Sequence, residues 1–185
     1  MKQILFLLLA VAAGFSVKAQ AEDPPRPQET ARSFMRVGDW NNAILVLSKA
    51  LLKDPDNLEL SKDLVLAYTY DRNFSKALEV VKPLLERNDA DVQVYQLGGN
   101  VYKALAETKD AEKMYKKALK KFPRSGPLYS EYGELLWEKK DYEAIQLWEK
   151  GIEVDPSYPG TITTQLPIII SQRTKYGALS TVRSL

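Results

Sequence analysis

Four stretches of this chain repeat one pattern between Met35 and Pro159, at intervals of 34, 34 and 33 residues. Each stretch has an alanine in its middle and ends at a proline or, once, at an aspartate. The last interval is shorter because Asp141–Ala144 holds one residue fewer than the matching Asp39–Ala43. A period kept over four units rarely arises by chance, so it constrains the fold more than any single motif does. The alanines are Ala43, Ala77, Ala111 and Ala144, and the closing residues are Pro55, Asp89, Pro123 and Pro156.

Within each unit the apolar residues are three or four positions apart, which places them on one face of a helix. The spacing predicts two helices per unit, joined by a tight turn. Small residues such as Gly99 and Gly133 stand where two helices must approach closely, and large aromatic residues fill the space beside them. Because one helix pair cannot bury its apolar face alone, at least three pairs must stack against one another.

This pattern resembles the signature of the tetratricopeptide repeat (TPR) family. The third unit shows it in full, with Tyr95, Gly99, Tyr102, Ala111, Tyr115, Ala118 and Pro123. The resemblance covers roughly residues 24 to 157. It implies an all-α fold, a TPR α-solenoid of about four helix-turn-helix repeats in a right-handed superhelix. We therefore expect a TPR domain over residues 28–157, with repeats at about 24–57, 58–91, 92–125 and 126–157.

The first residues predict export. A short basic start is followed by an almost unbroken apolar run from Ile4 to Val17, and small residues suit cleavage between Ala19 and Ala21. These features are typical of a signal peptide over residues 1–19. The alternative is an uncleaved anchor, but this run is shorter than the roughly 20 residues that a spanning helix needs. We expect a protein of the periplasm or cell envelope, with no stable membrane insertion after cleavage.

Composition excludes several classes of function. The chain has no histidine and no cysteine, which excludes Ser-His-Asp and Cys-His nucleophile systems, Cys/His zinc sites and disulfides. We expect no enzyme, no cofactor and no metal site. Loss of Lys2 and Lys18 with the signal peptide would leave equal numbers of basic and acidic residues, so overall charge does not favour nucleic acid. Three prolines among residues 24–27 predict a stiff linker over residues 20–27.

The TPR resemblance also implies where a partner binds. In TPR stacks the first helix of each pair lines the concave groove, so the candidates are polar or aromatic residues on those helices. The alternative for each is a solvated side chain or, for Tyr70 and Trp137, packing between helices. The candidates are Arg32, Arg36, Lys62, Thr69, Tyr70, Gln96, Asn100, Lys103, Glu134 and Trp137.

One subgroup of the family holds the C-terminal carboxylate of a chaperone peptide with lysine and asparagine side chains. Asn100 and Lys103 match part of that set, but Gln28 and Leu66 stand where other members of it are expected. The mismatch argues against a carboxylate clamp. A mixed groove suits an extended or helical segment of another protein instead.

A second surface is basic. The second helix of the third unit and its end carry Lys113, Lys116, Lys117, Lys120, Lys121 and Arg124. Positive charge at a helix C-terminus is favourable, and an outward helix keeps such side chains solvated. The alternative is binding to an acidic surface or a nucleic acid. Because no aromatic platform accompanies these residues, we expect no nucleic-acid partner.

Residues 158–185 break the pattern. A further helix should begin after Gly160 to cover the fourth unit, but no matching apolar stripe follows. Synonymous codons exist for which the neighbouring reading frame encodes NYYNAAAYYYLTKDKVWGALYGEIF, which resembles the segment after Tyr-Pro-Gly in secreted bacterial TPR proteins. We hypothesise that a one-base deletion near the Gly160 codon replaced the native segment. The tail would then be irregular, Trp148 and Ile152 would be partly exposed, and the uncovered end would allow self-association.

Together these features predict a non-catalytic scaffold that binds a protein or peptide segment in the concave TPR groove. A rival from another class is an envelope binder of glycans or small ligands, with Tyr70 and Trp137 as stacking surfaces. A third alternative is an accessory repeat domain of a longer protein.

Overall fold

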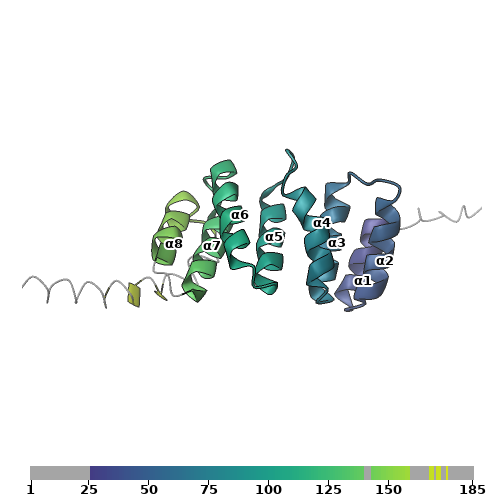
Figure 1. Ribbon diagram of the computed structural model, residues 1–185, viewed down its shortest axis with the longest axis horizontal. Coiled ribbons are helices and arrows are strands. Elements are labelled where there is room, and N and C mark those ends of the chain that lie inside the picture. Colours follow the sequence, from purple (N-terminus) through teal and green to yellow (C-terminus); the bar gives the residue numbers. More distant parts are fainter. Residues whose placement is uncertain (1–25, 140–142, 159–166, 169, 172–173, 175–185) are drawn as a thin grey trace, which may run out of the picture.

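The computed structural model describes residues 26–139, 143–158, 167–168, 170–171 and 174 (Figure 1). In that part of the chain eight α-helices follow one another, and no strand is present among the described residues. The helices are α1 (Pro27–Arg36), α2 (Trp40–Leu51), α3 (Leu58–Tyr70), α4 (Phe74–Leu84), α5 (Val92–Ala104), α6 (Thr108–Lys121), α7 (Gly126–Glu138) and α8 (Glu143–Val154). The predicted all-α arrangement of four helix pairs is confirmed.

The helices form one row from α1 to α8 (Figure 1). Each helix from α1 to α7 packs against the next one along the chain. The backbones of the odd-numbered helices also lie close to one another, α1 to α3, α3 to α5 and α5 to α7, whereas no two even-numbered helices among these eight approach as closely. The odd-numbered helices therefore lie close together on the inner face of the stack, and the even-numbered helices are spread over the outer face.

The turns inside the first three pairs share one geometry. Gly38, Arg72 and Ala106 have positive φ angles of 76°, 61° and 59° and follow the ends of α1, α3 and α5. In each turn the residue after them donates its N–H across five residues to a helix carbonyl, as Asp39 does to Phe34 at 2.9 Å. This left-handed residue ends the helix and returns the chain antiparallel.

Side-chain caps fix several helix starts. Asp39 accepts a hydrogen bond from the N–H of Asn42, Asn57 from that of Leu60, and Asp91 from that of Val94. Each cap satisfies a backbone donor that the first helical turn leaves without a partner. The repeat boundaries are thus set by local chemistry as well as by packing.

The core consists of small residues against large ones. Ala43, Ala77, Ala111 and Ala144 are fully buried. A methyl group on Gly99 would lie 1.9 Å from the hydroxyl of Tyr115, and one on Gly133 would lie 2.3 Å from Nε1 of Trp148. The predicted close approach of helices at these glycines is confirmed.

The predicted exposure of Trp148 is wrong, because only 1% of its surface is accessible. Its indole lies under α7, where Nε1 donates to the carbonyl of Ser130 at 3.1 Å. Ile152 is half-buried, as expected. Ile168 packs against the main core and so partly covers the α8 end of the stack.

The termini lie largely outside the described residues. The predicted signal peptide, most of the predicted linker and most of residues 161–185 are among the parts not described, and so is nearly all of the segment that concerns the frameshift hypothesis. Where we expect an irregular tail, the described residues Pro167, Ile168, Ile170, Ser171 and Thr174 are helical. Among the described residues, no helix has the length and apolar character needed to cross a membrane.

Candidate functional site

Polar side chains on the odd-numbered helices connect neighbouring repeats. Gln28 and Arg32 of α1 donate to the carboxylate of Asp63 on α3, Gln28 at 2.9 Å and Arg32 at 2.9 and 3.2 Å. Lys62 of α3 donates to Asp91, the cap of α5, at 2.8 Å, and also pairs with Glu59. The first two boundaries between repeats are therefore crossed by ion pairs.

The third boundary continues this set of bonds. Gln96 of α5 donates to Glu131 of α7 at 2.6 Å, and the hydroxyl of Tyr115 donates to the other oxygen of Glu131 at 3.2 Å. The ammonium of Lys103 lies 3.4 Å from Glu138 and 3.9 Å from Glu134. We call this set of polar contacts between neighbouring repeats the inter-repeat ladder.

Burial and bonding to neighbouring side chains act in opposite directions on the pKa values of the ladder groups. Burial acts to lower the pKa of Lys62, but its bonds to Asp91 and Glu59 outweigh this, so its pKa is raised and it stays charged. Burial raises the pKa of Glu131, and bonds from Gln96 and Tyr115 only partly oppose that rise. Because a buried charge is costly unless it is paired, the main role of these side chains is to hold repeats together.

Four predicted groove residues, Arg32, Lys62, Gln96 and Lys103, thus belong to the ladder. Their partners stand about one repeat away, with separations of 31, 29 and 35 residues for the hydrogen bonds of Arg32, Lys62 and Gln96. That offset is the signal in the sequence that identifies them, since residues one period apart on stacked helices are neighbours.

The other candidates have different surroundings. Thr69 donates to the carbonyl of Val65 within its own helix at 2.7 Å. Asn100 is exposed, Glu134 is half-buried, and the Trp137 ring lies 5.5 Å from that of Trp148. Trp137 therefore packs onto the core, in agreement with the alternative prediction that it packs between helices.

Arg36 and Tyr70 meet in a hollow at the α1 end of the inner face. The hollow has a volume of about 860 Å³, and Arg32, Met35, Trp40 and Leu66 also line it. The rings of Trp40 and Tyr70 stack at 5.1 Å with an interplanar angle of 13°, and 60% of Tyr70 is exposed. We call this the aromatic hollow.

Trp40 was not among the sequence-based candidates. Its equivalents one and two repeats later are Phe74 and Thr108, so the period marks it only as the first residue of a second helix. Trp40 differs from these equivalents because its neighbour is Tyr70, the last residue of α3. The sequence alone does not show that Tyr70 lies next to α2.

The hollow offers one cation beside the aromatic pair. The guanidinium of Arg32 is occupied by Asp63, whereas Arg36 bonds only the hydroxyl of Ser33, at 2.8 Å, and forms no ion pair within the described residues. Glu29 on the rim is exposed. This arrangement can pack an apolar or aromatic side chain on Tyr70 and bind a carboxylate at Arg36.

A row of paired helices whose first members line one open face, with no strand in the described part, defines an α-solenoid repeat protein. The family model of the tetratricopeptide repeat matches residues 34–100. This match identifies tetratricopeptide repeats in residues 34–100, and the solved structures below share the fold of such repeats over most of the chain.

Three solved structures show the likeness. A TPR protein from Parabacteroides merdae has a TM-score of 0.62 at 22% identity, covering 73% of this chain and 54% of its own. MamA from Desulfovibrio magneticus has a TM-score of 0.63 at 21% identity, covering 74% and 78%. A thermophilic TPR protein from Thermus thermophilus has a TM-score of 0.59 at 18% identity, covering 82% and 96%.

These identities establish the fold alone. The chain spans about half the length of the Parabacteroides protein. A comparison with curated proteins finds no match.

Proposed function

We propose that this protein is a non-catalytic, exported interaction scaffold that binds a segment of another protein at the α1 end of its inner face. The observation that supports this most is the stack of the exposed Tyr70 on the half-buried Trp40 in the aromatic hollow. Aromatic and arginine side chains dominate the binding energy of protein interfaces, and an aromatic ring loses little entropy when it is ordered.

The ladder explains why the hollow is favoured over the rest of the groove. Lys62 and Lys103 are already paired with carboxylates of this chain, so a partner that used them would have to break those contacts first. Arg36 and the face of Tyr70 require no such exchange. The partner segment therefore carries an apolar or aromatic side chain with a carboxylate near it.

The test is site-specific photocrosslinking. A benzophenone side chain replaces Tyr70 in the full chain and, as the matched control, Leu52, which is 85% exposed after the outer helix α2. We expect a defined protein adduct when benzophenone stands at position 70 and none when it stands at position 52. Adding Arg36→Ala to the protein with benzophenone at position 70 should reduce the amount of adduct. Equal adducts at both positions, or none at Tyr70, would contradict the proposal.

A glycan or small-ligand binder is the second candidate, because the exposed face of Tyr70 also suits stacking against a sugar ring. The predicted platform with Trp137 is weakened by the contact of that residue with Trp148. Quenching of the intrinsic tryptophan fluorescence by a sugar, at concentrations that leave the fluorescence of Tyr70→Ala unchanged, would favour this candidate over a protein segment.

A further inference from the structure

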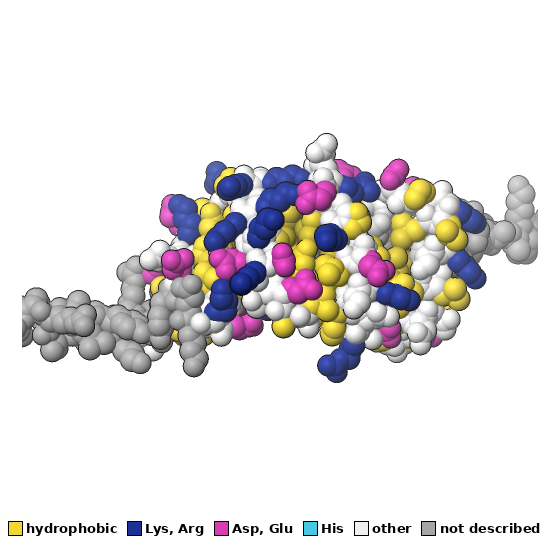
Figure 2. Space-filling model, in the orientation of Figure 1, with side chains coloured by type: hydrophobic (Ala, Val, Ile, Leu, Met, Phe, Trp, Pro, Cys, Tyr) yellow, Lys and Arg dark blue, Asp and Glu magenta, His cyan; other side chains and the backbone are white. Residues whose placement is uncertain are grey.

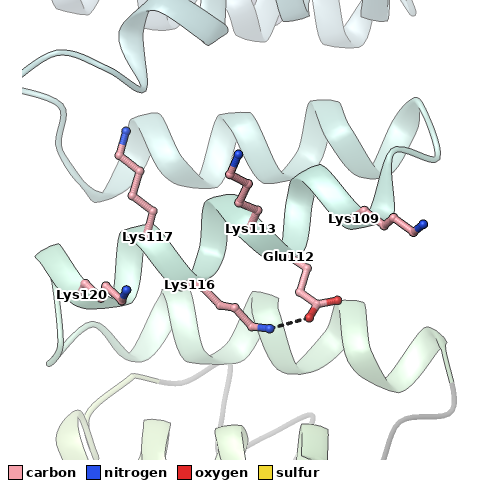
Figure 3. A pocket seen from close by; sticks show the side chains of 6 residues that line it. All are labelled: Lys109, Glu112, Lys113, Lys116, Lys117 and Lys120. Atoms are coloured by element: carbon pink, nitrogen blue, oxygen red, sulfur yellow. Dashed lines mark hydrogen bonds and ion pairs between the residues drawn. The ribbon is translucent and has the colours of Figure 1, made fainter.

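The outer helix α6 carries a row of lysines that the proposed function does not use. Lys109, Lys113, Lys116, Lys117 and Lys120 line an open depression of about 630 Å³. Figure 3 shows Lys113 and Lys117 extending on one side of α6 and Lys116 on the other, where it reaches Glu112. We call these five residues the lysine stripe. Dark blue side chains gather over α6 in the space-filling view (Figure 2).

Carboxylates neutralise only part of the stripe. Among the described residues, Glu112 is the only acidic one that lines the depression, and it is shared by Lys116 at 2.7 Å and Lys139 at 3.1 Å. Lys117 pairs with Glu86, which follows the end of α4, at 2.7 Å. Within the described part of the chain Lys109, Lys113 and Lys120 form no ion pair, so three charges point to solvent.

This concentration of charge is local. The whole chain has a formal net charge of only +2, so general attraction to polyanions is weak. From Lys109 to Lys120 the stripe runs eleven residues along one helix, which is about 16 Å at the rise of an α-helix. Any anion that binds here must therefore present negative charge over an area and not at a single point.

We propose that the lysine stripe docks this protein on an anionic phospholipid surface. Its cations are all lysines, which act as flexible point charges and suit a fluid array of phosphate headgroups. A nucleic-acid site would normally add stacking aromatic side chains, and no aromatic residue of the described chain lines the depression.

The position of the stripe fits this role. It lies on an even-numbered helix, whereas the aromatic hollow is built mainly on the odd-numbered helices α1 and α3. Docking through α6 leaves the inner face free for a partner. The inference does not depend on the proposed function, because the two surfaces share no residue.

The test compares the full chain on vesicles of phosphatidylcholine alone and on vesicles with equal amounts of phosphatidylcholine and phosphatidylglycerol. Any binding by the apolar run Ile4–Val17 and the flanking Lys2 and Lys18 is the same in the parent and in the variants below, so comparing these proteins isolates the stripe lysines. The variant K113Q/K120Q removes two unpaired stripe lysines. The matched control K49Q/K53Q removes two exposed lysines on and after α2, neither of which forms an ion pair among the described residues.

We expect binding to the anionic vesicles to exceed binding to the neutral ones and to weaken as salt is added. K113Q/K120Q should bind the anionic vesicles roughly 25-fold more weakly, about fivefold per lysine, while K49Q/K53Q binds as the parent does. Circular dichroism verifies that both variants fold. Equal binding to both vesicle types, equal loss in both variants, or a duplex RNA bound through these lysines in place of vesicles would overturn the proposal.

Discussion

The contact of Gly133 with Trp148 tests the packing of the core at the scale of a residue. We expect Gly133→Ala to lower the free energy of unfolding by about 1–3 kcal/mol, because its methyl group would lie 2.3 Å from the indole nitrogen. Urea unfolding measures the change. In the double variant with Trp148→Phe, the smaller ring should make the added methyl group less costly. Simple additivity of the two single changes would show that the methyl group does not clash with the indole.

Glu131 predicts a dependence of stability on pH. Burial raises its pKa above the ordinary value of 4.5, so its contribution to stability is full below that value and is lost as pH rises through the folded-state pKa. Glu131→Gln cannot ionise. The stability of the parent relative to this variant should therefore fall from about pH 4 to pH 7. Urea unfolding at both ends of the range tests this.

Glu86 provides a control of opposite sign. Its hydrogen bond from Lys117 lowers its pKa, so its contribution is present above the ordinary value and is lost as pH falls through the folded-state pKa. Relative to Glu86→Gln, the parent should become less stable toward acid. The same direction for both variants would mean that burial does not determine the behaviour of Glu131.

At the scale of an element, the turns offer a stabilising change. Ala106 has a φ of 59°, in the left-handed region that costs a residue with a Cβ about 1–2 kcal/mol. Ala106→Gly should raise the free energy of unfolding by about 0.5–1 kcal/mol, after the greater entropy of glycine in the unfolded chain is subtracted. Thermal unfolding measures it. Ala104→Gly, in the last turn of α5, should instead destabilise the protein. If both changes stabilise it, the gain at position 106 does not come from relief of the left-handed backbone.

The helices were predictable from the sequence, because period and helical spacing act on residues close in the chain. The left-handed turns were predictable only in part, since Gly38 signals one but Arg72 and Ala106 occupy the same position without that signal. The aromatic hollow was less predictable, because Tyr70 and Trp40 belong to different repeats and meet only after stacking. The roles of Lys62 and Gln96 likewise depend on partners in the next repeat.

At the scale of the whole molecule, the stack has two clusters of core residues. One includes Ala31, Leu47 and Leu64, from α1 to α3, and the other extends from α3 to α8, while Tyr68 and Val80 pack against both. Repeat proteins gain stability from neighbouring interfaces, so units at an end can open locally. The first helix pair is therefore the part whose stability depends most on its contacts with α3.

Asp63→Ala tests whether the first helix pair depends on its contacts with α3. It removes the acceptor of Gln28 and Arg32, whose guanidinium then turns to solvent, and should cost the first pair about 1–2 kcal/mol. We expect faster amide hydrogen exchange in α1 and α2 and unchanged exchange in α5 to α8. Glu79→Ala, an exposed carboxylate on α4 with no ion pair in the described residues, should change neither. Uniformly faster exchange in all eight helices would mean that the stack unfolds as one cooperative unit, so that the ladder stabilises the molecule as a whole and not only its first boundary.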